Sequence, residues 1–374
     1  MTKRGPVYLV ERDFPSFFRV PFVVYPATIP WVSMLKSDLK ALLDQKKNPH
    51  WKVAEGTYFT AMRDGVPVGR ILCHVHHAAN ERFGEKAASF GFFDVEDDVE
   101  TARALLAKAE EFARARHLTL LRGNMNLTAN QEVGVLTDGD DKAPFVAQMF
   151  QPAWVAKLLQ QCGFSATMPM TTFARFDVAD VDLDKIVTDK HRALMRDPDY
   201  VWREFRMNRF DDDVEIVRTI LNDSMGGNPL FVPMTREEAQ FQLGPMKMIM
   251  DPKLTRIAEF KGEPIGATIC IPDPNPILRR IGSRLTPWGL LRFLLDKRRI
   301  RRASVIIILV KRAYHGQGVI GVLNHDMMKA LKDGGYTELG GTWISDTNKA
   351  SLKQAALTGL HKHHRLALFE KPLA

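Results

Sequence analysis

Two stretches of the chain share one pattern of apolar and polar positions. Residues 58–69 and 254–266 each read as a strand, a tight turn and a second strand, and the turns contain Asp64-Gly65 and Lys261-Gly262. A two-residue hairpin turn needs positive φ angles, which glycine adopts without steric cost. The pattern therefore predicts one β-hairpin in each half of the chain.

The elements that follow the hairpins also correspond. Each copy continues with a buried strand, a helix and another strand, at 88–93, 99–116 and 118–122 in the first copy and at 305–310, 319–332 and 337–344 in the second. A helix closed by a glycine follows at 153–161 and 349–357, and the second copy is expected to begin with a strand at 205–210 and a helix at 211–221. The order predicts an α/β protein with two tandem copies of one unit, each a mixed β-sheet flanked by helices.

The polar, acidic segment 177–199 separates the two copies, so we expect one domain over 1–180 and a second over 200–374. No apolar stretch reaches the roughly 18 residues needed to span a bilayer, and no signal-peptide pattern is visible. The three cysteines are scattered and odd in number, which argues against a disulfide framework or a thiolate metal site. These features predict a cytoplasmic protein.

The positive charge of the chain is concentrated in one segment. Residues 278–302 contain nine basic residues and one acidic residue, which accounts for the whole formal charge of +8. A local patch of this kind indicates a local anionic partner. The patch belongs to an insertion at 272–302, between the second hairpin and the buried strand that follows it.

The centre of this insertion, 285–295, is strongly apolar and is flanked by basic clusters. Apolar anchors beside arginines are typical of a segment that lies at the surface of an anionic membrane. The residues expected to contact lipid are Trp288, Leu290, Leu291, Arg292 and Phe293. A helix packed on the core with solvated arginines remains an alternative, whereas nucleic acid is disfavoured because the aromatic residues are not interleaved with the basic ones.

A glycine loop joins the buried strand 305–310 to the helix 319–332. Its residues are Lys311-Arg312-Ala313-Tyr314-His315-Gly316-Gln317-Gly318. Glycines between a strand and a helix let the backbone approach a ligand, and the free N–H groups of the helix start attract an anion. At the same place the first copy has the acidic segment 94–98 without paired glycines, which should repel a pyrophosphate.

The strand, glycine loop and helix resemble the pyrophosphate-binding motif of the GNAT superfamily of acyl-CoA-dependent N-acyltransferases. Asn348, which precedes a helix ending at Gly359-Leu360, is similar to a second landmark of that superfamily. This chain departs from the motif at His315, where Arg or Gln is usual, and at Ile320, where Gly or Ala is usual. The resemblance implies acyl-CoA as a co-substrate with no permanently bound cofactor, and it assigns acyl-CoA binding to Leu309, Val310, Lys311, His315, Gly316, Gln317, Gly318, Val319, Ile320 and Asn348.

Further segments narrow the resemblance within this superfamily. The runs 90–93, 122–126, 231–235 and 272–275 resemble tandem bacterial GNAT proteins and, among them, the bacterial ceramide synthases. That resemblance implies transfer of an acyl group to a lipid amine such as a sphingoid base, on the cytoplasmic side of the inner membrane. Two alternatives remain open: acylation of a soluble amine or amino acid, and a non-catalytic protein that binds acyl-CoA.

An amine can attack a thioester directly, so no protein nucleophile is required, but a base must accept the ammonium proton. Asp346, Glu132 and Tyr314 are the candidates. Each has an ordinary explanation as well, because Asp346 could cap the following helix and Glu132 could lie on a surface turn. His315 is expected to donate to a phosphate.

Two histidine clusters have other expected roles. His74 and His76 share one face of a strand, but no cysteine or carboxylate completes a ligand set, so no metal site is predicted. His361, His363 and His364, near the end of the chain, are expected at a solvated edge.

Overall fold

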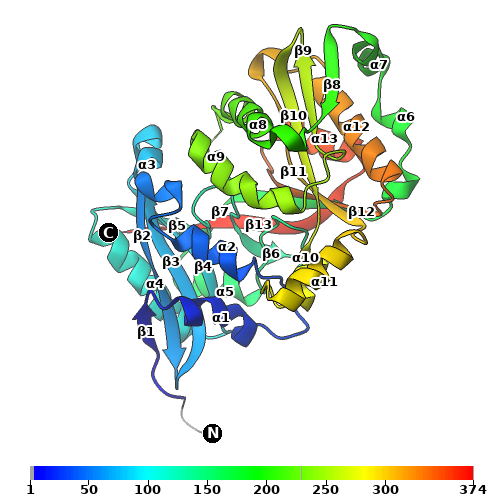
Figure 1. Cartoon of the computed structure of the whole chain (residues 1–374). Coiled ribbons are helices and arrows are strands. Elements are labelled where there is room, and N and C mark those ends of the chain that lie inside the picture. The colour runs from blue at the N-terminus through cyan, green and yellow to red at the C-terminus, as the bar shows by residue number, and fades with distance from the viewer. Residues whose placement is uncertain (1–3, 229, 374) are drawn as a thin grey trace.

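A computed structural model describes residues 4–228 and 230–373 and contains one continuous mixed sheet (Figure 1). The first half of the chain forms β1 (Tyr8–Glu11), α1 (Phe14–Val24), α2 (Lys36–Leu43), η1 (Pro49–Lys52), β2 (Ala54–Arg63), β3 (Val66–His76), α3 (His77–Phe83), β4 (Ala87–Val95), α4 (Val99–Arg114), β5 (Leu120–Gly123), β6 (Val135–Asp138), α5 (Trp154–Gln161) and β7 (Ser165–Arg175). The connecting segment carries η2 (Val178–Asp180), α6 (Leu183–Ile186) and α7 (Asp189–Arg196).

The second half repeats much of this order. Its elements are β8 (Tyr200–Glu204), η3 (Met207–Arg209), α8 (Phe210–Met225), α9 (Arg236–Leu243), η4 (Gly244–Met248), β9 (Arg256–Phe260), β10 (Glu263–Pro272), α10 (Asn275–Arg280), α11 (Pro287–Lys297), β11 (Arg302–Val310), η5 (Arg312–Tyr314), α12 (Val319–Asp333), β12 (Glu338–Ser345), α13 (Lys349–Leu357) and β13 (His361–Pro372). The predicted α/β class and the tandem arrangement are both confirmed.

Both predicted hairpins form. The turn between β2 and β3 has positive φ at Asp64 (50°) and Gly65 (76°), and the turn between β9 and β10 has positive φ at Lys261 (50°) and Gly262 (80°). Two consecutive positive φ angles match the right-handed twist of the paired strands. Each copy therefore contains a hairpin set by the same short-range signal.

The last strands of the two copies are exchanged. The strand order around the centre is β4-β5-β13-β7-β12-β11, so β13, from the end of the chain, pairs antiparallel with β5 of the first copy. In return, β7 of the first copy pairs with β12 of the second. Figure 1 shows β13, in red, crossing the middle of the molecule between the two halves. One sheet thus continues through both copies. The expected domain boundary at 180–200 remains a prediction.

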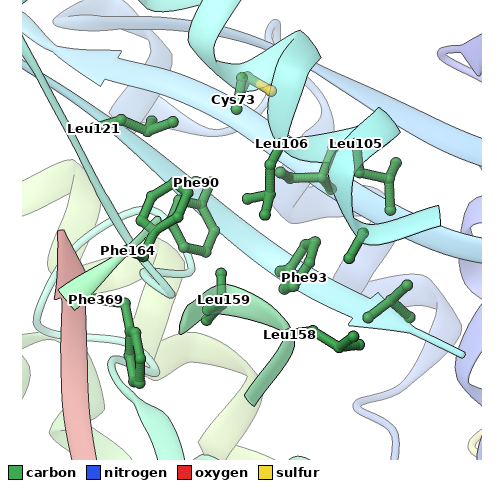
Figure 2. Close-up of a cluster of buried hydrophobic side chains, with 14 of the residues drawn as sticks. Cys73, Phe90, Phe93, Leu105, Leu106, Leu121, Leu158, Leu159, Phe164 and Phe369 are labelled. Atoms are coloured by element: carbon green, nitrogen blue, oxygen red, sulfur yellow. The ribbon is translucent and has the colours of Figure 1, made fainter. Parts of the chain in front are cut away.

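The exchanged strand contributes to the core of the first copy. Phe369 of β13 is fully buried in the same apolar cluster as Phe90, Phe93 and Phe164 (Figure 2). Phe90 packs edge-on against Phe93 and Phe164, and its ring centroid lies 5.7 Å from that of Phe93 and 5.5 Å from that of Phe164. Burying an aromatic side chain of this size contributes about 2 kcal/mol, so the exchange is held by packing as well as by backbone hydrogen bonds.

One predicted strand was misplaced. The structure has β8 at 200–204, whereas the expected strand at 205–210 contains the short 3₁₀ helix η3 and the first residue of α8. Phe205 and Phe210 are buried, and their rings pack at 5.4 Å in the core of the second copy. Their apolar character therefore reflects anchoring of the helix start and not an extended strand. The segment 177–199, expected to be a polar connection, contains two helices, α6 and α7.

Candidate active site

Strands β11 and β12 run parallel and then separate. Their pairing ends at Val305 and Gly341. The register between β10 and β11 shifts at this level, so that Ile306 is the extra residue of a β-bulge. From Ile307 to Val310, in the described structure, β11 has no strand partner on the β12 side. The divergence leaves one edge of β11 without a partner strand at the level of the predicted residues Leu309 and Val310.

Apolar side chains accompany this open edge. Ile306 and Ile307 on β11 are half-buried, together with Val146 and Met246, which pack in the same cluster. Trp343 on β12 is also half-buried, in the neighbouring cluster. Partly exposed apolar surface beside an open strand edge is suited to an acyl chain.

The glycine loop presents free backbone donors. Gly316 and Gly318 have φ of 75° and 100°, values that favour glycine, and α12 starts at the next residue. Within the described ranges, the amides of Gly316, Gly318, Val319 and Ile320 donate no hydrogen bond. Four unsatisfied N–H groups at the start of a helix form an anion-binding site.

The side chains of the loop fold back onto their surroundings. A ring nitrogen of His315 bonds the carbonyl of Val310 at 2.9 Å, and Gln317 Nε2 donates to the Ala313 carbonyl at 3.0 Å. Lys311 pairs with Glu263, and Tyr314 is half-buried beside Phe260. The backbone amides are therefore the groups left for an anion, whereas the imidazole expected to donate to phosphate is bonded to the end of β11.

The first copy has filled the equivalent anion site with its own carboxylate. Asp98 caps α4, and its Oδ2 accepts from the Thr101 amide at 2.9 Å. The same carboxylate pairs with Arg63, which holds its pKa near 2, although burial alone would raise that pKa. A diphosphate at this position would have to displace the chain's own anion.

In the first copy, side chains also occupy the opening where β4 and β5 separate. Asn126 Oδ1 accepts from the Phe92 amide at 2.7 Å, and Asn124 Oδ1 accepts from the Phe93 amide at 3.0 Å. These amides lie where β4 and β5 cease to pair. The two asparagines belong to the run 122–126, whose sequence predicts no role for them. Only their position between the strands reveals one.

Asp346, a predicted base, directly follows β12. Its Oδ2 pairs with Arg365 at 2.8 Å, and its Oδ1 accepts from Thr171 Oγ1 at 2.9 Å. The cap of α13 is Asn348, whose Oδ1 accepts from the Ser351 amide at 3.1 Å. Both carboxylate oxygens of Asp346 are thus engaged by neighbouring side chains, and capping occupies the side-chain oxygen of Asn348.

Glu132, the second predicted base, is not on an exposed turn. Its Oε2 accepts from Asn126 Nδ2 at 2.8 Å. Burial raises the pKa of Glu132, and the nearby carboxylate of Asp94 raises it further, against the opposing effects of Asn126 and Arg70. A carboxylate with a raised pKa accepts a proton more readily near neutral pH.

Helix α11 presents an apolar face to solvent. Trp288 is 80% exposed and Leu291 is 48% exposed, and Leu290, Leu294 and Leu295 are exposed beside them. Arg292 lies on the same helix and pairs weakly with Asp296 at 3.8 Å. Phe293 differs from the prediction, because it is only 1% exposed and faces the protein. Its role is to anchor α11 and not to contact lipid.

Among the histidines near the end of the chain, His361 is exposed, as predicted, but the two that follow it are not at a solvated edge. His363 and His364 are buried, and their ring nitrogens bond the carbonyls of Ala143 and Lys142, each at 3.0 Å. His74 is also buried and bonds the Met125 carbonyl at 3.1 Å. No group of three or more side chains suited to a metal ion is present among the described residues.

Buried neutral histidines predict acid sensitivity. Burial lowers the pKa of His74 and of His364 from 6.5 to about 4, and that of His50 to about 2. Below pH 6.5 the unfolded chain binds protons that the folded chain excludes, so stability falls as pH drops toward 4, by up to about 1.4 kcal/mol per pH unit for each histidine. Urea unfolding between pH 7 and 5 should show this decline.

A single replacement tests the cause. Both ring nitrogens of His50 lack a hydrogen-bond partner in the described structure, so His50→Phe removes a titrating group without leaving a polar partner unpaired. We expect a shallower decline with unchanged stability at pH 7. An unchanged slope would show that His50 does not titrate on unfolding.

Several known proteins are similar to this chain in sequence or in fold. No family model matches the chain. A bacterial ceramide synthase from Caulobacter vibrioides is 26% identical, with 94% of each chain covered. Protein YghO from Escherichia coli K12 is 25% identical over 98% of this chain and 94% of the relative. Among solved structures, a tandem GNAT protein from the clavulanic acid biosynthesis pathway matches 98% of both chains at 14% identity with a TM-score of 0.59.

This chain has the tandem GNAT fold. A GCN5-related N-acetyltransferase from Sphaerobacter thermophilus agrees, at 12% identity and a TM-score of 0.55 over 98% of this chain and 95% of the other. The tandem GNAT fold expected from the sequence is therefore confirmed. In the tandem GNAT fold of this chain, the second copy keeps the open strand edge and the free loop amides, and the first copy keeps neither.

Proposed function

We propose that this protein is an N-acyltransferase that moves an acyl group from CoA to the amine of a membrane lipid, with a sphingoid base as the lead acceptor. The observation that carries the proposal is the open edge of β11, which leads directly to the four free amides of the glycine loop. The half-buried apolar side chains beside that edge suit a long acyl chain. The relative named bacterial ceramide synthase supports both the acyltransferase class and the lipid acceptor.

The reaction requires few protein groups. The neutral amine attacks the thioester carbonyl carbon, a C–N bond forms, the C–S bond breaks, and the CoA thiolate leaves. The free backbone edge of β11 is the source of donors for the oxyanion that develops on the carbonyl oxygen. One proton must leave the attacking nitrogen, and one proton is taken up by the thiolate.

We assign the proton acceptor to Glu132. Burial raises the pKa of Glu132, which favours it as a base near neutral pH, whereas both carboxylate oxygens of Asp346 are engaged by Arg365 and Thr171. Val133, the next residue, packs in the same apolar cluster as Trp343 of β12. This packing connects the Glu132 segment to the strand that borders the opening. Tyr314, beside the glycine loop, is better suited to packing against Phe260 than to proton transfer.

The activity assay is direct. Purified protein is incubated with palmitoyl-CoA and a long-chain amino alcohol, and free thiol and N-acylated product are measured. We expect thiol release that depends on the lipid amine. Release with a soluble amine and not with the lipid would favour the alternative acceptor, whereas saturable CoA binding without any product would favour a non-catalytic protein.

The exposed face of α11 is the feature that favours a membrane-resident acceptor. Among the helices of the described residues, none has the length and apolar character that a bilayer-spanning helix needs. The apolar face of α11 together with the basic residues of the insertion provides the chemistry for contact with anionic lipid.

A matched pair of variants tests this contact. Trp288→Ser combined with Leu291→Ser should weaken binding to phosphatidylglycerol vesicles at least about tenfold, because two anchors leave the bilayer. The control combines Phe176→Ser with Leu357→Ser, residues that are 59% and 47% exposed and lie outside the insertion. Equal vesicle binding by the two double variants in a sedimentation assay would reject α11 as the membrane contact.

A further inference from the structure

Helix α7 (Asp189–Arg196) packs against the start of α12. A β-carbon on Gly321 would lie 2.4 Å from His191 Nε2, and one on Gly318 would lie 3.0 Å from His191 Cδ2. Any larger residue at these positions would displace α7. The start of α7 is itself fixed, because Thr188 and His191 form a reciprocal capping box there. The connection between the copies is therefore docked on the glycine loop by direct contact.

This docking places a lysine at the free amides. Lys190 Nζ donates to the Gly316 carbonyl at 2.9 Å, and the amide of the same glycine is one of the four without a partner. The lysine stem has four rotatable methylene groups, so its ammonium group can turn from that carbonyl to an anion bound on the adjacent amide.

Some basic side chains around the glycine loop form ion pairs, and others do not. Across the described residues, Lys190 and Arg312 make no ion pair, although their neighbours Arg192 and Lys311 do. Arg192, on the same helix as Lys190, pairs with both Asp184 and Asp189. A lysine without an ion pair, held at the carbonyl of Gly316 beside four unsatisfied N–H groups, is an arrangement that a bound phosphate would complete.

We infer that Lys190 is a binding residue for the diphosphate of CoA, held in place by the packing of His191 on Gly318 and Gly321. This inference rests on the proposed function, because it concerns the same co-substrate. It adds a group from the connection between the copies to a site otherwise made of backbone amides. The second copy alone, taken from residue 200, would lack this group.

Calorimetric titration with CoA, with dephospho-CoA and with pantetheine tests the inference in the full-length protein. Lys190→Ala should weaken binding of CoA and of dephospho-CoA equally, by about tenfold, which is the value of one hydrogen bond to a charged group. Pantetheine, which has no diphosphate, should bind with unchanged affinity. Lys190→Arg should retain most of the affinity. The matched control is Lys185→Ala, an exposed lysine of the same segment, which pairs with Asp182.

The outcomes separate the two ideas. Failure of the unaltered protein to bind CoA would overturn the proposed function itself. Binding by the unaltered protein that persists fully in Lys190→Ala would overturn only the role of Lys190. A loss confined to CoA, with dephospho-CoA unaffected, would also overturn the assignment, because it would place the ammonium group at the 3′-phosphate.

Discussion

Gly316→Val is expected to lower kcat/KM for acyl-CoA by about a hundredfold or more, whereas Gly262→Val is expected to leave it unchanged. Both glycines have similar positive φ angles, 75° and 80°, and a β-carbon on either would meet no atom within 4 Å. The conformational cost of the side chain, about 1–2 kcal/mol, is therefore similar at the two positions. Only Gly316 lies among the free amides of the loop.

The expected loss follows from the number of donors affected. A valine at 316 favours negative φ, and relaxation toward it would turn the amides of Gly316 and Gly318 away from a common anion. Hydrogen bonds to charged groups contribute about 1.5–3 kcal/mol each, so two of them account for a hundredfold or more. Steady-state kinetics with varied palmitoyl-CoA, together with thermal unfolding of both variants, measures the effect. Equal activity of the two variants would show that the loop does not bind the co-substrate.

The repeated hairpins and the glycine loop were predictable because each is set by local sequence. A two-residue turn and a strand–loop–helix transition depend on a few adjacent residues, here Asp64-Gly65, Lys261-Gly262 and 316–318. The exchange of β7 and β13 was not predictable in the same way. An apolar strand such as 366–369 has the same pattern whether it pairs within its own copy or with β5.

Some candidate residues were placed wrongly for a related reason. Phe293 and the histidines 363 and 364 belong to segments whose composition suggested exposure, and neighbours distant in sequence bury them. His364, for example, is covered by the segment around Lys142, more than two hundred residues earlier. Composition reports the average environment of a segment, whereas burial of one side chain depends on contacts across the whole chain.

Lys190 is a candidate binding residue that the sequence alone does not reveal. The sequence of its segment predicts only a connection, because acidic and polar residues dominate 177–199. The signal that was available is local: Thr188 followed three residues later by a side chain that returns the hydrogen bond marks a helix start. The contact of that helix with Gly321 could come only from the three-dimensional structure.

Glu132→Gln is expected to lower kcat by about two to four powers of ten and to remove the acid limb of its pH dependence. A base must be ionised to accept a proton, so activity falls as pH drops through the pKa of the base. Burial raises the pKa of Glu132, which places that fall at a higher pH than for a solvated glutamate. Glutamine keeps the size of the side chain and the carbonyl oxygen that accepts from Asn126, but it cannot take a proton.

Two further variants make the result specific. Asp346→Asn leaves Arg365 without its partner, so it should lower the unfolding temperature while the acid limb of kcat remains. Glu110→Gln removes a mostly buried carboxylate that pairs with Lys371, far from the opening in the chain's second copy, and should change neither kcat nor the limb. The measurement is kcat from pH 5 to 9 with both substrates saturating. If the acid limb disappears in Asp346→Asn and persists in Glu132→Gln, the proton acceptor is Asp346, and the ion pair with Arg365 serves to orient a base instead of suppressing one.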